Sequence, residues 1–305
     1  MSASQIYVIG AAGQVGSAMM ATSDGRAVIP LTSADIDITD LTSTRNALAN
    51  LSAGDVVINT AAHTAVDAAE SDRAAAYAVN ADGPANLAAV TSTSGARLVH
   101  LSTDYVFAHP VLGDDGAPRP FEPDDVDGVP ETVYGASKLA GERAAQAADP
   151  ATVVVRTAWV FTGGRQDADF VATMCRLEAE RPQIRVVDDQ TGSPTYAPDL
   201  ARALWDLVDQ LNEPALRGGA VVHATNAGSA TWWDVARAVF DNLGAQPERV
   251  QPCTTPEFPR PAPRPSYSVL SAKSWVGAGL APLRDWRAAL GEAMTARSGD
   301  GNSLG

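Results

Sequence analysis

The sequence predicts an α/β fold in which a doubly wound parallel sheet is joined to a smaller C-terminal lobe. Two observations lead to this prediction. Short apolar runs alternate with helical patterns through the first half of the 305 residues, a succession typical of parallel strands and crossover helices. After Phe161 the alternation loosens, and the chain returns to the strand–helix pattern only near residues 197–224. We therefore expect a sheet domain and a smaller lobe that binds substrate.

The composition is that of a globular protein with small ligands rather than polyanions as partners. Hydrophobic residues make up 45% of the chain, charged residues 19%, and the formal net charge is −14. Such a charge disfavours nucleic acid and anionic membranes, although a local pocket can still bind an anionic small molecule. The two cysteines, Cys175 and Cys253, are too few for a disulfide framework and suit a reducing compartment. We expect both to pack as small apolar side chains.

No segment of the sequence is typical of targeting or of a membrane span. The first residues lead into an apolar strand without a basic segment ahead of it. No window approaches the roughly 18 consecutive apolar residues that a spanning helix needs. We therefore expect a cytoplasmic protein.

A glycine-rich turn follows the first predicted strand, residues 6–9. Gly10, Gly13 and Gly16 recur in it with GxxGxxG spacing, and a helix is predicted over residues 14–22. Glycines let the backbone approach a pyrophosphate, whose charge is then stabilised at the helix N-terminus. Three glycines alone are a weak signal, because glycine is common in any tight turn. Their place directly after the first strand predicts a Rossmann-like dinucleotide site.

The second predicted strand, residues 26–31, ends without an acidic residue that could bind an adenosine 2′-hydroxyl, and Ser33 is the nearest polar candidate. The choice between NADH and NADPH therefore stays open, and this strand end favours NADPH, or the use of both cofactors, over NADH alone. Asp37 and Ile38 precede a helix predicted over residues 41–50 and are placed to meet the adenine. A simple capping loop fits their spacing equally well.

Small residues follow the third predicted strand, residues 55–59. They are Ala61 and Ala62, and His63 comes next. Small side chains at the carboxyl end of a strand allow a ligand to approach, as binding in the crevice of a doubly wound sheet requires. His63 also fits an ordinary loop histidine, and we do not expect it to be a catalyst. Helices are predicted over residues 67–79 and 84–93.

The fourth predicted strand, residues 97–102, leads into Thr103 and Asp104. Hydroxyl and carboxylate groups at this end of a strand belong to the edge of the sheet that binds ligands. The Asp104 carboxylate could instead cap the following turn. A long acidic loop over residues 108–130 comes next, and either a mobile lid or a solvated loop fits its composition.

Tyr134 and Lys138 lie four residues apart at the start of a predicted helix. This spacing places both side chains on one face, within reach of one small ligand. A nearby ammonium lowers the pKa of a phenol, and such a tyrosine can exchange a proton with a carbonyl or alcohol oxygen. An ordinary amphipathic helix start gives the same pattern, so the pair gains meaning only from the rest of the chain.

The second half of the chain alternates less regularly. Strands are predicted over residues 151–156, 184–188 and 219–224, and helices over 169–181, 197–211, 232–243 and 284–296. Residues 297–305 are expected to be disordered. We predict a dinucleotide-binding domain made of residues 1–160 and 192–226, and a substrate-binding lobe made of residues 161–191 and 227–305.

Four elements stand in a fixed order along the chain and together resemble the extended short-chain dehydrogenase/reductase superfamily. They are the three glycines after the first strand, residues 59–63 after the third, residues 102–105 after the fourth, and the Tyr134/Lys138 pair. Further strings resemble the dTDP-4-dehydrorhamnose reductase family within it: His63–Glu70, Ser102–Phe107, Lys138–Glu142, Arg156–Val160, Asp189–Thr195 and Arg264–Leu270. The resemblance extends from about Gln5 to Ala296.

This resemblance implies reduction of the C4 ketone of dTDP-4-dehydro-β-L-rhamnose by NADPH, with NADH possible. Tyr134 would be the proton donor, and Lys138 would lower its pKa and hold the nicotinamide ribose. Thr103 would bind the ketone oxygen or the tyrosine. The implied sugar contacts are Thr103, Asp104 and Trp159, and Trp159 also fits a core aromatic residue. The implied cofactor contacts are Gly13, Gln14, Val15, Asp37, Ile38, Ala61, Ala62 and His63.

One position departs from the family pattern. Some members dimerise around Mg²⁺ held in part by a glutamate two residues past the third glycine, and Ala18 occupies that place here. We therefore list no metal site, regard Mg²⁺ as doubtful and expect a monomer rather than a metal-bridged dimer. Arg156 stays unassigned.

Two other functions compete with this interpretation. A nucleotide-sugar epimerase or 4,6-dehydratase could use the same scaffold, but the dehydratases need an acidic pair after the threonine, and Tyr105 follows Asp104 here. A related reductase of another keto-sugar belongs to the same alternative. A non-catalytic subunit, like the regulatory subunit of methionine adenosyltransferase, is the second. The intact Thr103, Tyr134 and Lys138 argue against lost catalysis.

Overall fold

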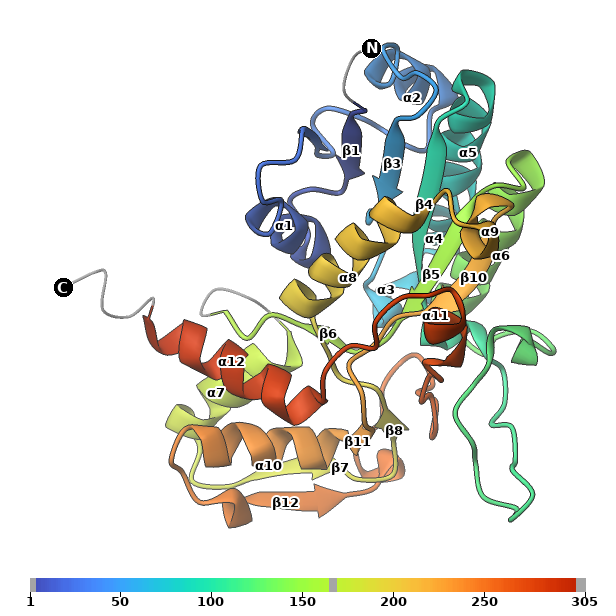
Figure 1. The fold of residues 1–305 in the computed structure, drawn as a ribbon. Helices are drawn as coiled ribbons and strands as arrows, with labels where there is room; N and C mark the ends of the chain where they lie inside the picture. Colours follow the sequence, from blue (N-terminus) through green and yellow to red (C-terminus); the bar gives the residue numbers. More distant parts are fainter. Residues whose placement is uncertain (1–3, 165–168, 300–305) are drawn as a thin grey trace.

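The centre of the protein is a parallel sheet of six strands in the order β10-β5-β4-β3-β1-β2 (Figure 1). The strands are β1 (Ile6–Ile9), β2 (Val28–Leu31), β3 (Val56–Asn59), β4 (Arg97–Thr103), β5 (Val153–Thr157) and β10 (Ala220–His223). The computed structural model describes residues 4–164 and 169–299. The chain runs from β1 outward to β2 and then returns to β3 on the other side of β1, so the sheet is doubly wound, as predicted. Ligands bind such sheets at the carboxyl ends of the strands beside this switch point.

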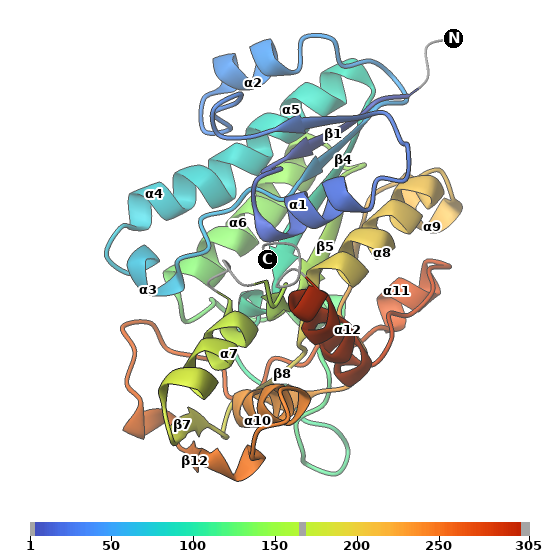
Figure 2. The ribbon, with the colours of Figure 1, turned by 90° about the vertical axis from the view of Figure 1, so that its left-hand side faces the viewer.

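Helices cover both faces of the sheet because successive strand residues point to opposite sides. Ile6 and Val8 pack in one core cluster and Tyr7 and Ile9 in another. The first face carries α1 (Gln14–Ala21), α8 (Ala197–Gln210), α9 (Pro214–Arg217) and α11 (Lys273–Gly277). The other face carries α2 (Leu41–Ala47), α3 (Val66–Ala69), α4 (Arg73–Tyr77), α5 (Gly83–Ser94) and α6 (Val133–Ala148), as Figure 2 shows. The central strands β1, β3, β4 and β5 are therefore buried on both faces, whereas the edge strand β2 is partly exposed.

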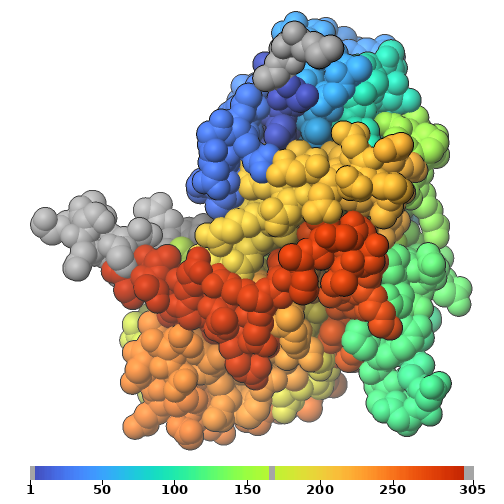
Figure 3. All heavy atoms as spheres, in the orientation of Figure 1, coloured from blue at the N-terminus to red at the C-terminus, as the bar shows by residue number. Residues whose placement is uncertain are grey.

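A second lobe lies below the carboxyl ends of the strands and has its own core. Phe240 and Trp286 are fully buried in this core. Its helices are α7 (Phe170–Glu180), α10 (Trp232–Asn242) and α12 (Trp286–Gly299). Its strands form pairs: β7 (Ile184–Val187) with β12 (Val250–Cys253), β8 (Thr191–Gly192) with β11 (Ala230–Thr231), and β6 (Val160–Phe161) with β9 (Thr195–Tyr196). In Figure 3 the red C-terminal segment lies along the junction of the two parts. Trp275 of this segment packs in the core of the sheet.

The helical segment between β3 and β4 is divided differently from the prediction. Helix α3 ends at Ala69 and α4 begins at Arg73, with Asp72 accepting a hydrogen bond from the Ala75 N–H at 3.1 Å. A π-helical turn, Ala78–Asp82, then connects α4 to α5 without a break. The predicted interruption before Pro84 is therefore wrong. Pro84 is the second residue of α5, which directly follows the π-helical turn, where the i→i−4 hydrogen-bond pattern of an α-helix is already interrupted.

Two further segments differ from expectation. Helix α12 continues through Gly299, so the predicted disorder is wrong for residues 297–299, and residues 300–305 lie outside the described part of the chain. The loop over residues 108–130 is anchored in its second half: the Phe121 N–H donates to the Val269 carbonyl at 2.8 Å, and the Ser271 N–H donates to the Phe121 carbonyl at 2.9 Å. The part near Leu112, which is 60% exposed, projects outward (Figure 1).

Both cysteines are buried and free, as predicted. Within residues 4–164 and 169–299, none of the helices has the length and apolar character that crossing a membrane requires.

Candidate active site

A large cleft opens at the carboxyl ends of β1, β3, β4 and β5, between the sheet and the second lobe. Its volume is about 1080 Å³. Ligand pockets usually measure about 300–1,000 Å³, so this cleft has room for a dinucleotide and a second ligand. The predicted site residues that line it are Gly10, Gly13, Gln14, Val15, Asp37, Ile38, Ala61, Ala62, Thr103, Asp104, Tyr134, Lys138 and Trp159. The fold thus brings nearly all of them to one place.

The glycine turn fits a dinucleotide closely. Gly10 has φ of +80°, and a Cβ there would lie 2.7 Å from the Ala61 nitrogen. Gly16 does not line the cleft, but a Cβ there would overlap the Gly10 carbonyl oxygen, so it sets the packing of the turn. Gly13 is the N-cap of α1, and no side chain caps this helix. The N-terminus of α1 is therefore suited to an anionic group such as a pyrophosphate.

The adenosine end of the cleft presents hydroxyl groups and one carboxylate. Thr32, Ser33 and Asp37 line it, and Asp37 accepts hydrogen bonds from the Thr39 N–H at 2.9 Å and the Thr39 hydroxyl at 2.7 Å. Among the described lining residues, Lys138 is the sole lysine or arginine. A hydroxyl can bind a ribose hydroxyl or a phosphate, so these groups suit either NADH or NADPH.

The loop after β3 is held from behind by two asparagines. Asn59 accepts a hydrogen bond from the Ala61 N–H at 3.1 Å. Asn80, in the π-helical turn, accepts from the His63 N–H at 2.8 Å and donates to the His63 carbonyl at 3.1 Å. The Asn80 amide also donates to the Ser137 hydroxyl of α6 at 3.0 Å. His63 therefore lies behind the cleft and does not line it, whereas Ala61 and Ala62 do.

Helix α6 carries the predicted acid and its partner into the cleft. The Thr132 hydroxyl caps the helix by accepting from the Gly135 N–H at 2.9 Å. One turn apart, Tyr134 and Lys138 both line the cleft, and the Lys138 ammonium donates to the Leu101 carbonyl of β4 at 2.6 Å. The predicted side-by-side placement of this pair is therefore present.

The pKa of Tyr134 differs from the prediction. Burial raises the pKa of the phenol to about 12, against a lowering by hydrogen bonding with Thr103. Burial also lowers the pKa of Lys138 to about 8, partly offset by the charge of Glu142. The predicted net lowering of the tyrosine pKa is thus wrong, because the cost of burying a phenolate is the largest contribution. Tyr134 is a protonated phenol here, which is the form that a proton donor requires.

Asp104 lies beside Thr103 and is almost fully buried. Its Oδ1 accepts a hydrogen bond from the Thr103 hydroxyl at 3.0 Å, whereas its Oδ2 has no hydrogen-bond partner among the described residues. Burial raises the pKa of Asp104 to about 6 in spite of the nearby hydroxyls of Ser268 and Thr103. Thr103, not Asp104, caps the following turn by accepting from the Tyr105 N–H at 3.3 Å. A polar ligand in the cleft could satisfy the second oxygen of Asp104.

Trp159 lines the cleft from the lobe side with an unusual backbone. Its φ is +47°, in the left-handed region. Its ring stacks on that of Trp232 with centroids 3.5 Å apart. Trp159 is half-buried: part of it lines the cleft, and part of it packs against other aromatic residues. Both interpretations that the sequence allowed therefore apply to it.

Several residues that line the cleft are not among the predicted site residues, including Ser102, Thr157, Phe170 and Trp232. The hydroxyls of Ser102 and Thr157 are buried without hydrogen-bond partners among the described residues. Thr157 pairs with Thr103 across β4 and β5, so its place at the end of a strand was the signal available for it. Phe170 and Trp232 begin helices of the second lobe, whose approach to the sheet has no local sequence signal.

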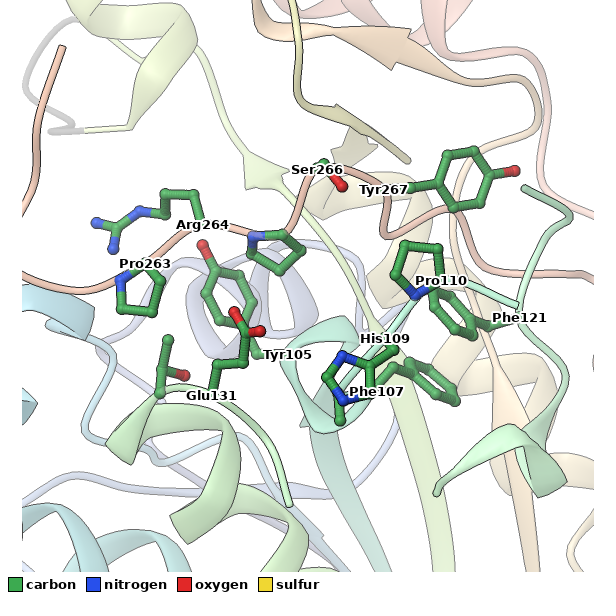
Figure 4. Close-up of a pocket in the computed structure, with 13 residues that line it drawn as sticks. Tyr105, Phe107, His109, Pro110, Phe121, Glu131, Pro263, Arg264, Ser266 and Tyr267 are labelled. Carbon is green, nitrogen blue, oxygen red and sulfur yellow. The ribbon is translucent and has the colours of Figure 1, made fainter. Parts of the chain in front are cut away.

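A smaller hollow of about 180 Å³ adjoins the cleft, and Tyr105 lines both. Figure 4 shows the Tyr105 ring beside the Glu131 carboxylate, with Phe107 and Phe121 on the far side of the hollow. The latter two rings stack with centroids 4.1 Å apart. This hollow separates the loop over residues 108–130 from the segment that carries Arg264.

No group of three or more histidine, cysteine, aspartate or glutamate side chains in the described ranges is arranged as a metal site. Ala18, at the position where some relatives of the resembled family place a metal-binding glutamate, is buried in the core of the sheet.

Comparison with known proteins identifies relatives over nearly the whole chain. The family described as RmlD substrate binding domain matches residues 4–298. The dTDP-4-dehydrorhamnose reductase of Mycobacterium tuberculosis (strain CDC 1551) is 52% identical over 296 residues, which are 96% of this chain and 93% of that protein. A probable dTDP-4,6-dihydroxy-2-methyloxan-3-one 4-ketoreductase of Streptomyces antibioticus is 45% identical and covers 94% of this chain and 93% of its own length.

A solved structure from the same group of reductases has the same fold as this chain. The crystal structure of dTDP-4-dehydrorhamnose reductase from Bacillus anthracis in complex with NADP superposes with a TM-score of 0.83 at 32% identity. The match covers 96% of this chain and 99% of that one. The similarity therefore includes both the sheet and the second lobe.

Proposed function

The chain belongs to the RmlD substrate binding domain family and is an oxidoreductase, and on this premise we propose that it reduces the C4 ketone of dTDP-4-dehydro-β-L-rhamnose, giving dTDP-β-L-rhamnose. The observation that carries the proposal is the meeting of Thr103, Tyr134 and Lys138 in one cleft with a glycine turn suited to a dinucleotide. The relative from Mycobacterium tuberculosis supplies the identity of the sugar.

In this proposal a bound nicotinamide dinucleotide supplies the hydride for the ketone carbon. Negative charge then develops on the ketone oxygen, and donors aimed at that oxygen stabilise the transition state. Tyr134 gives its phenolic proton to this oxygen, and the Thr103 hydroxyl supports the transfer by hydrogen bonding. The positive charge of Lys138 favours the phenolate that remains, and the same side chain holds the nicotinamide ribose.

The residues proposed to hold the dinucleotide follow the floor of the cleft. Gly10, Gly13 and Gly16 shape the turn, and Gln14 and Val15 begin the helix that faces the pyrophosphate. Asp37 and Ile38 meet the adenine. Ala61 and Ala62 form the wall beside β3, and His63 supports this wall from behind. We propose NADPH as the reductant with NADH as the alternative. The NADP complex of the relative from Bacillus anthracis supports the first choice.

For the sugar we propose contacts with Thr103, Asp104 and Trp159. The unsatisfied Oδ2 of Asp104 supports this, because a sugar hydroxyl can donate to it.

Two properties of the whole protein remain predictions. They are a cytoplasmic location and a monomer that needs no bridging Mg²⁺, the latter because buried Ala18 offers no ligand.

The proposal is tested by removing the phenolic hydroxyl. Tyr134→Phe should lower kcat by roughly 10²–10⁴-fold, the usual contribution of a positioned acid, with the melting temperature little changed. The assay is the loss of 340 nm absorbance from NADPH, and then from NADH, on adding dTDP-4-dehydrorhamnose generated in situ.

A matched control for this test is Tyr77→Phe. The Tyr77 hydroxyl accepts a hydrogen bond from Arg73 on α4, away from the cleft, and turnover should stay at the wild-type level. Unchanged turnover in Tyr134→Phe would remove the tyrosine from the mechanism. A wild-type protein that binds the dinucleotide and oxidises neither NADPH nor NADH would contradict the proposed reaction.

A second candidate is the reduction of a different dTDP-keto-sugar in the same cleft. The relative from Streptomyces antibioticus, at 45% identity, carries the name of such a ketoreductase. The same absorbance assay distinguishes the two when other dTDP-4-keto-sugars are offered in place of dTDP-4-dehydrorhamnose. The higher kcat/KM then identifies the substrate.

A further inference from the structure

Trp159 has a backbone conformation that its surroundings must enforce. Asp24 and Trp159 are the two non-glycine residues with positive φ in the described ranges, and Asp24 precedes a glycine in an exposed turn. A bulky residue in the left-handed region is strained and persists only where neighbouring groups hold it there. Such strain is often found at ligand-binding sites. The groups that hold Trp159 are therefore of functional interest.

Two groups enclose the Trp159 indole. The Trp232 ring lies against it with centroids 3.5 Å apart and an angle of 4° between the planes, so the two rings overlap face to face. Gly192 also lies against the indole: a Cβ there would be 2.6 Å from the indole nitrogen and closer still to two adjoining carbons. Any side chain at residue 192 would therefore displace the indole. The Trp159 carbonyl also accepts a hydrogen bond from the Thr195 N–H at 3.1 Å.

Trp232 is itself fixed in place. It is the first residue of α10, whose start is closed by a capping box in which Thr231 and Asp234 bind each other's backbone N–H at 2.9 and 3.0 Å. The Phe170 ring packs on Trp232 with centroids 4.5 Å apart. Trp159, Trp232 and Phe170 all line the cleft. They form one aromatic wall on the lobe side, opposite the sheet.

We propose that Trp232 is a positioning residue for the sugar: by stacking on Trp159, it holds the strained indole in the place where the aromatic wall meets the pyranose ring. This inference rests on the proposed reduction of a nucleotide sugar. Trp232 stacks on Trp159 and Gly192 lies close against its indole, so these two residues set the position of Trp159. The wall in turn fixes how far the ring of the sugar can lie from Tyr134 and Thr103. Loss of this wall should therefore weaken the binding of the sugar, and a displaced pyranose ring should also react more slowly.

The chain provides a matched control on the neighbouring position. Trp233 follows Trp232 in α10 but does not line the cleft. Its indole N–H donates to the Val250 carbonyl at 3.0 Å, and Arg237 lies 4.8 Å from its ring centroid. Replacing Trp233 removes the same volume from the same turn of the helix. A merely structural effect should therefore appear in both variants.

The experiment compares Trp232→Ala, Trp232→Phe and Trp233→Ala. We expect Trp232→Ala to raise the KM for the keto-sugar by about tenfold or more, with the dissociation constant of the dinucleotide, measured by fluorescence titration without sugar, unchanged within about twofold. Trp232→Phe should restore most of the affinity, because a stacked ring remains. Trp233→Ala should keep the wild-type KM. The exciton-coupled circular dichroism of the stacked indoles should be lost in Trp232→Ala and retained in Trp233→Ala.

Gly192→Ala provides an independent variant if Trp232→Ala does not fold. A methyl group there must push the indole away, so the KM for the sugar should rise and the exciton signal should change while dinucleotide binding is kept. If the wild type turns over the sugar and both the Trp232 and Gly192 variants keep its KM, the inference is wrong. An equal loss in Trp233→Ala, or a parallel loss of dinucleotide binding, would also overturn it. A wild type without turnover would instead overturn the proposed function, and the inference with it.

Discussion

Asp104 is a buried carboxylate whose pKa makes stability depend on pH. Burial raises its pKa to about 6, above the ordinary value of 3.8. Between these two values the folded protein holds a proton that the unfolded chain has released. Stability therefore falls as the pH rises from about 4 to about 6, and the loss is complete above the folded pKa. This cost is consistent with a functional reason for placing the group in the cleft.

Replacing Asp104 by asparagine removes this titration. We compare the free energy of unfolding of the wild type with that of Asp104→Asn at pH 4 and at pH 7.5. The difference, wild type minus variant, should be lower at pH 7.5 by about 2–3 kcal/mol, since one pKa unit corresponds to about 1.4 kcal/mol. Urea unfolding at both pH values measures it. Any effect of the new amide on the free energy of unfolding that does not depend on pH cancels when the two pH values are compared.

Asp35→Asn is the control for this experiment. Hydrogen bonds from the Thr32 N–H and hydroxyl lower the pKa of Asp35, so its removal should give a pH trend of the opposite sign. A difference between wild type and Asp104→Asn that does not change with pH would show that Asp104 titrates normally.

The residues of the site that the sequence predicts are those whose partners lie nearby in the chain. Tyr134 and Lys138 share one turn of a helix, and the glycines share one turn after β1. The pKa of Tyr134 could not be predicted, because the groups that surround it, Thr103, Asp104 and Tyr105, lie at the end of β4, far from Tyr134 in the chain. The hydroxyl of Thr157 was missed for the same reason: its neighbour Thr103 is on another strand.

Helix α6, which carries the proposed acid, is fixed to β5 by a buried ion pair. The Arg156 guanidinium binds the Glu142 carboxylate through two hydrogen bonds of 2.7 and 2.9 Å, and the exposed fractions of the two side chains are 3% and 2%. Arg156 also donates to the Pro123 carbonyl at 2.9 Å. The arginine that the sequence left unassigned therefore connects α6, β5 and the anchored half of the loop over residues 108–130.

Removing one partner should leave a buried charge unpaired. We expect Glu142→Gln to lower the free energy of unfolding by about 3–5 kcal/mol, whereas Glu142→Leu combined with Arg156→Met should cost much less, because both charges are then gone. Urea unfolding of the wild type and these two variants measures this. Glu180→Gln, which breaks the exposed Arg176–Glu180 pair on α7, should cost only about 0.5 kcal/mol. A Glu142→Gln cost no larger than this control would mean that Arg156 finds another partner.

The strands and most helices could be predicted because apolar periodicity is a local property. The break between α3 and α4 could not, since alanine-rich sequence over residues 67–82 shows little contrast between faces. The anchoring of Phe121 also had no local signal. Its backbone partners, Val269 and Ser271, are far away in the chain.

The sheet and the second lobe have separate cores, and a few connections join them. The division of the chain that we predict from sequence remains a prediction. Trp275, from a range assigned to the lobe, packs in the core of the sheet. The reason is that the chain after β12 crosses back over the sheet before forming α12, a path that depends on tertiary contacts.

One of these connections is centred on Asp67 of α3. Its carboxylate pairs with Arg264 at 3.0 Å and Arg260 at 2.9 Å, and it accepts from the Ala262 N–H at 3.2 Å. These three partners belong to a proline-rich strap, residues 258–268. Asp67 directly follows Val66, which lines the cleft, so the connection lies at the edge of the site.

Asp67→Ala should loosen the strap without unfolding the protein. The ion pairs are partly exposed, so we expect the free energy of unfolding to change by only about 1 kcal/mol or less. Local opening of the strap should become easier, because its charged contacts with the sheet domain are lost, and the amides near Ala262 should exchange faster with deuterium. Hydrogen exchange followed by mass spectrometry measures this. Asp209→Ala, which removes the Arg26–Asp209 pair at 2.7 Å elsewhere on the surface, should leave the exchange of the strap unchanged. If Asp67→Ala also leaves it unchanged, the strap is held by its backbone hydrogen bonds to Thr191 rather than by charge.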